Sequence, residues 1–249
     1  MKNAFTLAEV LITLAIIGVV AAMTMPTLIQ NHQKKSLEVA TKKFYSMMSQ
    51  AVKQYMADEG VDDLRNTPMT DMDITGDSKK AAQEATENFV RKYLKVVKEC
   101  GKDEVCFANS YKTQKNEESA IGFGSWYGYK DFITADGMVI EIIAADSDTP
   151  FLLYVDVNGK KGPNKIGYDL WSMDIFYDGS IDEGGATPEC KKGIPNESGI
   201  LCGGEERNSP AVVRQHRFYS CQGRGDGTQG GGYGGCFGHF MENGFKFDY

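Results

Sequence analysis

The chain begins with a long apolar run that changes into an amphipathic helical period. Residues 5–25 read FTLAEVLITLAIIGVVAAMTM, and Glu9 is the one charged side chain among them. A helix of about 20 apolar residues crosses the hydrocarbon of a bilayer, because each residue rises about 1.5 Å. The run therefore predicts a membrane-spanning helix. The carboxylate inside it marks a functional residue, because an unpaired charge in hydrocarbon is costly.

Residues 26–58 predict an amphipathic continuation of this helix. Pro26 removes a backbone donor and predicts a kink or local break near residues 23–25. Gly60 is a stop signal. Between them, large apolar side chains recur at helical spacing and predict a face that packs on a domain: Leu37, Phe44, Met48, Ala51 and Tyr55.

The next part of the chain predicts a globular domain over residues 59–182. Apolar positions in residues 78–100 recur at the spacing of a second helix. Strand patterns follow at residues 131–135, 138–145, 151–157 and 171–177, and Asp136-Gly137 between the first two predicts a tight hairpin. A long helix laid on a small antiparallel sheet is an α+β arrangement.

Residues 183–249 predict an irregular extension that depends on cross-links. Glycine, proline and asparagine are frequent there, and such a segment buries little apolar surface of its own. In an exported domain cysteines favour disulfides, and no Cys-x-x-Cys spacing supports the alternative, a zinc site. The simplest of 15 pairings joins sequence neighbours: Cys100 with Cys106, Cys190 with Cys202, and Cys221 with Cys236.

The overall charge argues against a general nucleic-acid-binding protein. The formal net charge is -7 and the sequence pI is about 5.1, whereas a nucleic-acid footprint is usually basic. A modest basic cluster lies in the extension, at Arg207, Arg214, Arg217 and Arg224. We interpret it as a solvated face, with contact to an anionic partner as the alternative.

The N-terminal residues carry a family resemblance. The leader MKNA followed by FTLAEVLITLAIIGVVAAMTMP resembles the N-terminus of type IV prepilins and type II secretion pseudopilins. The resemblance implies that prepilin peptidase removes residues 1–4 by cleavage between Ala4 and Phe5, and that the new terminus at Phe5 is N-methylated. Glu9 and Pro26 match the glutamate and the helix-kinking proline of that family. Ala4 departs from the usual glycine, which implies slower processing.

The physical role of Glu9 follows from the change of surroundings that the resemblance implies. The apolar helix is solvated first by lipid and then by the same helix of neighbouring subunits. A lone carboxylate in that dry core costs several kcal/mol. The free amino terminus of an adjacent subunit would neutralise Glu9 and set the stagger between subunits, a registry role known for buried ionic groups. The alternative is a plain membrane anchor with an incidental glutamate.

The loop DVNGKKGPNKIGYD at residues 156–169 has two interpretations. Its Asn-Gly and Gly-Pro pairs form tight turns, and it resembles a loop that recurs in pilin-like proteins. Oxygen atoms of Asp156, Asn158 and Asp169 could instead gather a calcium ion. Lys160 stands where an EF-hand loop requires an oxygen donor, so we favour the turn and expect no cofactor.

The sequence as a whole predicts a structural subunit and no enzyme. It has no phosphate-binding Gly-rich loop with a lysine, no HExxH and no Gly-x-Ser-x-Gly. We predict a pilin-like subunit of a type IV pilus or a type II secretion pseudopilus, and its length and extension favour a minor or specialised one. The alternative is a binding module in the extension, for adhesion, an exoprotein or DNA, that the helix merely delivers.

The same reading predicts the location and the partners. Lys2 before the apolar run favours a single pass through the inner membrane with the N-terminus in the cytoplasm. The filament would then stand in the periplasm or at the cell surface. The implied partners are other copies or homologous pilin subunits, prepilin peptidase, the inner-membrane assembly platform and membrane lipid.

Overall fold

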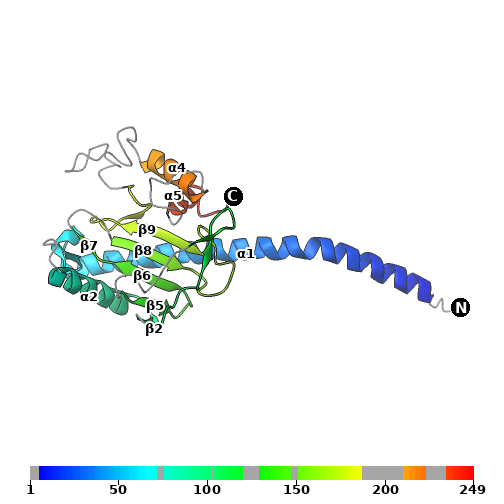
Figure 1. Cartoon of the computed structure of the whole chain (residues 1–249), viewed down its shortest axis with the longest axis horizontal. Helices are drawn as coiled ribbons and strands as arrows, with labels where there is room; N and C mark the ends of the chain where they lie inside the picture. The colour runs from blue at the N-terminus through cyan, green and yellow to red at the C-terminus, as the bar shows by residue number, and fades with distance from the viewer. Residues whose placement is uncertain are drawn as a thin grey trace.

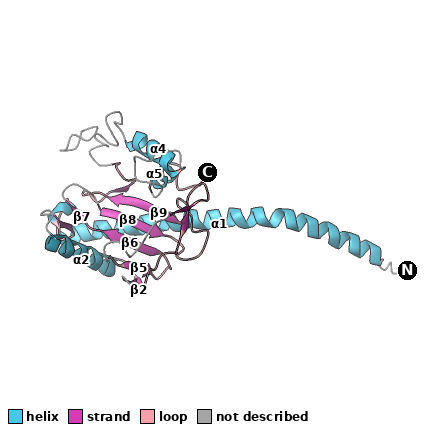
Figure 2. Ribbon diagram, in the orientation of Figure 1, coloured by secondary structure: helices cyan, strands magenta, loops and turns pink. Residues whose placement is uncertain are grey.

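A long helix that projects from a small domain of mixed helices and strands gives the molecule its shape (Figure 1). The structure is a computed structural model that describes residues 6–71, 76–101, 104–119, 129–146, 151–186, 210–222 and 234–249. The first half of the helix extends away from the domain, and the second half runs along its sheet (Figures 1 and 2). The predicted α+β, pilin-like fold is confirmed.

Helix α1 spans Leu7–Glu59, 53 residues in one piece. Its C-terminal half buries an apolar stripe with helical spacing, as the sequence predicts: Leu37, Thr41, Phe44, Met48, Ala51, Val52 and Tyr55. The helix ends at Gly60, which adopts a φ of 69° and donates its N–H to the Ala57 carbonyl at 3.2 Å. Glycine takes this left-handed conformation without steric cost, so the predicted stop is confirmed.

Pro26 lies inside α1, and the helix continues on both sides of it. Figure 1 shows a gentle curve along the projecting half and no interruption of the ribbon. The local break expected near residues 23–25 is therefore not observed. A proline removes one helical hydrogen bond, and the bonds of the neighbouring turns are enough here to keep the helix continuous.

The core of the domain is a six-stranded antiparallel sheet in the order β10-β9-β8-β6-β5-β2. A hairpin with Asp136-Gly137 at its turn joins two of the strands, and Gly137 has a φ of 81°. The strands are β2 (Val96–Cys100), β5 (Asp131–Thr134), β6 (Val139–Ile143), β8 (Phe151–Asp156), β9 (Leu170–Ile175) and β10 (Ile181–Asp182). Three short elements lie at the end of the domain away from the projecting helix: β1 (Thr70–Asp71), β7 (Ala145–Asp146) and the 3-10 helix η1 (Leu64–Asn66). Separately, β3 (Tyr111–Lys112) pairs with β4 (Glu118–Ser119).

The second helix is shorter than predicted. Helix α2 spans Gly76–Tyr93, and the chain then enters β2 at Val96, so the expected helix over residues 78–100 is wrong in its last part. Val97, one of the apolar positions that fit the spacing of a helix, is 66% exposed. β2 is an edge strand that pairs with β5. The ladder to β5 overrides the helical spacing, because two adjacent valines favour extended backbone.

The described residues of the C-terminal extension contain two helices that the sequence pattern did not predict, α4 (Pro210–Cys221) and α5 (Cys236–Glu242). Phe237 and Phe240 of α5 are fully buried beside Trp171 of β9, with ring centroids 6.2 and 4.6 Å from it. Both belong to the same hydrophobic cluster as α1 and the sheet. The described part of residues 183–249 therefore shares the core of the pilin-like domain.

Candidate assembly site on the N-terminal helix

The start of α1 is capped by a reciprocal pair of side chains. The Glu9 N–H donates to the Thr6 hydroxyl oxygen at 3.2 Å. The N–H and the hydroxyl of Thr6 both donate to Oε2 of Glu9 at 2.8 Å. This capping box satisfies donors that a helix N-terminus would otherwise leave free. Because both bonds end on Oε2, the second oxygen of the carboxylate is left for a donor from outside the helix.

The projecting half of α1 is apolar on every side. Its large side chains are exposed from 42% at Val10 to 79% at Leu7, and the exposure continues through Leu28 and Ile29. Among the described residues, α1 is the one helix long and apolar enough to cross a membrane. Apolar surface of this extent requires lipid or other apolar helices as its surroundings.

Residues 1–25 match the prokaryotic N-terminal methylation motif. The chain has the N-terminus of a type IV pilin or pseudopilin. A family of unknown function (DUF6613) matches residues 27–134 of this pilin-like chain. The matched region begins just after Pro26 and covers the rest of α1, α2 and the first strands. No curated protein and no solved structure matches the chain.

The site residues expected from the sequence lie along the N-terminal segment. Ala4 and Phe5, the expected cleavage and methylation positions, lie outside the described residues. Glu9 and Pro26 lie on the same projecting helix, separated by 17 residues or about 25 Å along its axis. The structure therefore places Glu9 near one end of the apolar surface and Pro26 near the other.

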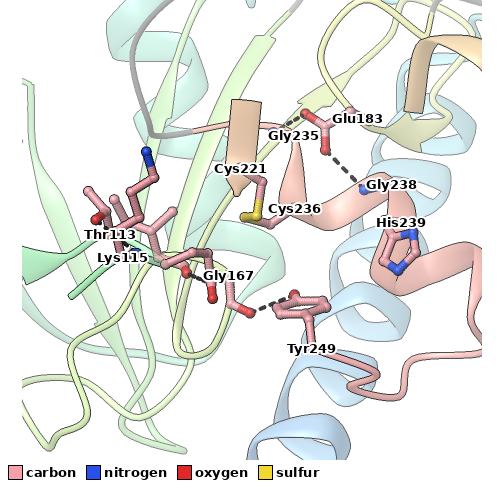
Figure 3. The surroundings of a disulfide bond; sticks show 12 residues. Thr113, Lys115, Gly167, Glu183, Cys221, Gly235, Cys236, Gly238, His239 and Tyr249 are labelled. Atoms are coloured by element: carbon pink, nitrogen blue, oxygen red, sulfur yellow. Dashed lines mark hydrogen bonds between the residues drawn. A yellow bond between two sulfur atoms is a disulfide. The ribbon is translucent and has the colours of Figure 1, made fainter. Parts of the chain in front are cut away.

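Two disulfides join the sequence neighbours that proximity suggests. Cys100 at the end of β2 pairs with Cys106, with their Cα atoms 5.7 Å apart. Cys221 at the end of α4 pairs with Cys236 at the start of α5, with Cα atoms 5.1 Å apart (Figure 3). Cys190 and Cys202 lie outside the described residues. The bonds tie an edge strand and the two C-terminal helices to their surroundings.

The loop at residues 156–169 uses its carboxylates to hold its own turns. Asp156 is fully buried and accepts from the Tyr111 hydroxyl at 2.6 Å and from the Asn158 N–H at 3.1 Å. Asp169 accepts from the N–H groups of Asn164 and Lys165 at 2.7 and 2.6 Å. Burial raises the pKa of Asp156 to about 7 and that of Asp169 to about 6. These contacts favour the turn interpretation, because both carboxylates bind groups of the loop and its neighbours. Among the described residues, no group of three or more His, Cys, Asp or Glu side chains is arranged to hold a metal ion.

The basic cluster of the extension is partly buried and paired, so its interpretation as a solvated face is wrong for Arg214. Its guanidinium forms ion pairs with Asp182 of β10 and, at 2.8 Å, with Glu242 of α5. Arg217 donates to the Gly184 carbonyl at 3.0 Å. Arg207 and Arg224 lie outside the described residues. The arginines therefore join α4 to the sheet edge and to α5, an arrangement that no sequence spacing indicates.

The last residues of the chain lie along α1, a contact that the sequence analysis missed. The Phe247 N–H donates to Glu38 of α1 at 3.0 Å, and the Lys34 ammonium donates to the Tyr249 carbonyl at 3.0 Å. The Tyr249 hydroxyl donates to the Gly167 carbonyl at 2.8 Å (Figure 3). The aromatic residues concentrated in positions 237–249 were the one sequence feature that could have indicated this contact. They pack where α1 leaves the domain.

Proposed function

We propose that this chain is a pilin-like structural subunit of a type IV pilus or a type II secretion pseudopilus. Prepilin peptidase removes residues 1–4, Phe5 is methylated, and α1 holds the subunit in the inner membrane with the N-terminus in the cytoplasm. The assembly platform then moves the subunit into a filament, where it packs against other copies or homologous pilins.

The observation that carries this proposal is the joint occurrence of the methylation motif and the bare apolar helix. The motif covers residues 1–25, and no residue in the apolar, membrane-length part of α1 is buried by the described domain. Glu9 is the one charged side chain between residues 5 and 31. An amino terminus of a neighbouring helix supplies the donor that its second carboxylate oxygen lacks, and this pairing sets the stagger.

The extension supports a minor or specialised subunit more than a separately folded binding module. Phe237 and Phe240 are fully buried in the core that α1 and the sheet share. Glu183 and Arg214 join the extension to the sheet edge through buried polar contacts. We infer that the described part of the extension is a fixed element of the subunit. It covers the side of the domain that carries β9 and β10.

Mass spectrometry of the N-terminal peptide from the native host tests the processing step. The expected peptide begins at a methylated Phe5. A peptide that retains Met1, or one cut after the apolar run, would contradict the proposal. Ala4→Gly is the matched variant, because it restores the residue usual in the family, and it should speed cleavage without changing the cleavage position.

A further inference from the structure

Lysines gather at the end of the domain from which α1 projects. Lys34 lies five residues beyond Ile29, the last large residue of the exposed apolar surface, or about 7.5 Å along the axis. The ammonium groups of Lys34 and Lys165 lie 5.5 and 5.1 Å from the centre of one ring, that of Tyr168. Lys112 of β3 lies near them because β3 bonds to the loop of residues 156–169. The Lys112 N–H donates to the Asn164 carbonyl at 2.8 Å.

None of these three lysines forms an ion pair with an Asp or Glu side chain of the described residues. Lys34 donates to a carbonyl oxygen of Tyr249, and Lys165 donates to Oδ1 of Asn116, both at 3.0 Å. No ion pair within 4.0 Å joins Lys34, Lys112 or Lys165 to a described Asp or Glu. The pKa of Lys165 is lowered, first by burial and then by the positive charges of Lys34 and Lys112. The like charges are therefore close enough to repel one another.

The nearby carboxylates are few and mostly engaged elsewhere. Glu38 pairs with Lys35 at 3.3 Å and accepts from the Phe247 N–H. Asp169 is fully buried and accepts from two backbone N–H groups. Glu118 lies opposite Lys112 in the β3–β4 register without forming an ion pair. A group of lysines at one edge of the domain that forms no ion pair with a described Asp or Glu side chain suits an anionic partner.

The opposite end of the domain carries negative charge. Asp58, Glu59 and Asp62 lie where α1 ends, and all three are exposed to solvent. Lys34 and Asp58 are 24 residues apart on α1, or about 36 Å. The lysine cluster thus lies toward the apolar segment of α1, and this acidic group lies away from it. A negatively charged surface on that side would attract one end and repel the other.

We propose that Lys34, Lys112 and Lys165 seat the domain on the anionic phospholipid headgroups of the membrane that holds α1. The headgroup layer is about 5–8 Å thick on each side of the hydrocarbon, the level at which Lys34 leaves the apolar surface. Tyr168, which lies between two of the lysines, suits the interface, where tyrosine is enriched. The inference rests on the membrane-held state of the proposed function and is independent of filament assembly.

The test compares lysine reactivity in two lipids. The full chain is placed in nanodiscs, one chain per disc, made of phosphatidylcholine alone or mixed with phosphatidylglycerol. Amine acylation rates are read residue by residue by mass spectrometry, with exposed Lys79 and Lys80 of α2 as internal controls. Acylation at Lys34, Lys112 and Lys165 should slow about fivefold in the anionic discs, the factor expected for one lysine at a charged surface. Salt should abolish the difference, and the controls should not change.

A paired variant keeps the result interpretable. Lys112→Gln with Lys165→Gln should reduce the protection of Lys34 in anionic discs, while Lys79→Gln with Lys80→Gln should leave it intact, provided that circular dichroism shows both folded. Equal rates in the two lipids would overturn the proposal. Protection that appears in neutral lipid and grows with protein concentration would also overturn it and assign the surface to a second copy. A chain that does not stay in the disc would instead contradict the membrane-held state itself.

Discussion

The carboxylate of Glu183, directly after β10, accepts a 2.9 Å hydrogen bond from the backbone N–H of Gly238 in α5. The same carboxylate accepts from Gly235 at 2.7 Å, as Figure 3 shows for Gly235 and Gly238. It also accepts from Gly184 at 3.2 Å. Glu183 is 1% exposed, and its burial raises its pKa. One side chain thus satisfies the N-terminus of α5 and holds the extension against the edge of the sheet.

Removing this carboxylate should destabilise the domain. Glu183→Ala leaves three buried N–H groups without an acceptor, so the free energy of unfolding should fall by about 2–5 kcal/mol. Glu183→Gln keeps one acceptor oxygen and should lose less. Denaturant titration of the full chain in detergent, followed by circular dichroism, measures both. Glu84→Ala, at an exposed position of α2, is the control and should stay within about 0.5 kcal/mol of the wild type. A loss below 1 kcal/mol for Glu183→Ala would show that the contact is dispensable.

The two observed disulfides should differ in their contribution to stability. Cys221–Cys236 closes a loop of 15 residues and Cys100–Cys106 one of 6. In the chain-entropy view, they stabilise the fold by about 3 and about 2 kcal/mol, because the longer loop restricts the unfolded chain more. Paired Cys→Ser variants, titrated with denaturant, test the order. A larger loss for the Cys100/Cys106 pair would show that strain or local packing outweighs loop entropy.

Stability should fall as the pH rises from about 4 to about 7. Burial raises the pKa of Asp156 and of Asp174 to about 7, and Asp174 faces Glu183, Asp182 and Arg217. In this window the folded state keeps protons that the unfolded state has released, so each group lowers the free energy of unfolding by up to about 1.4 kcal/mol per pH unit. The loss should level off above pH 7.

A single substitution tests this pH dependence. Asp156→Asn removes one of the buried acids, so the slope of unfolding free energy against pH between 4 and 7 should become shallower. Asp62→Asn, at an exposed position, should leave the slope unchanged. Denaturant titrations at a series of pH values give the slopes. An equal slope for Asp156→Asn and the wild type would exclude Asp156 as a source of the effect.

Glu9→Ala should block incorporation into filaments and leave leader removal intact. In our proposal, the variant removes the carboxylate that accepts a hydrogen bond from a neighbouring chain, and cleavage precedes that step. Thr6→Val is the matched control, because it removes the hydroxyl of the capping box and keeps the carboxylate. Immunoblots of sheared filaments and of membranes separate the two steps. Normal incorporation of Glu9→Ala would exclude the role of Glu9 in setting the stagger.

Local patterns in the sequence were reliable where the chain bonds mainly to itself. The stripe on α1, the stop at Gly60 and the turn at Asp136-Gly137 each depend on residues within a few positions of one another. The end of α2 was misjudged because β2 forms through a ladder to β5, more than 30 residues later. The helical spacing at Val97 was coincidental.

The candidate site divides in the same way. The apolar run, Glu9 and the motif of residues 1–25 are continuous in sequence, so their position on one helix could be predicted. Neither Glu183 nor the lysine pair around Tyr168 could be predicted, since each is assembled from segments that lie far apart in the chain. The sequence also presents Arg214 as one of several exposed charges, although it pairs with the buried Asp182.

The sequence by itself determined that this protein has a long N-terminal helix with a prepilin-type start, because helix period, caps and hydrophobic length are local properties of the chain. The tertiary structure alone decided that residues 234–249 belong to the core, and that lysines from α1, β3 and the loop before β9 meet where the helix leaves the domain. Long-range contacts of this kind depend on which surfaces bury each other, and no spacing along the chain encodes them.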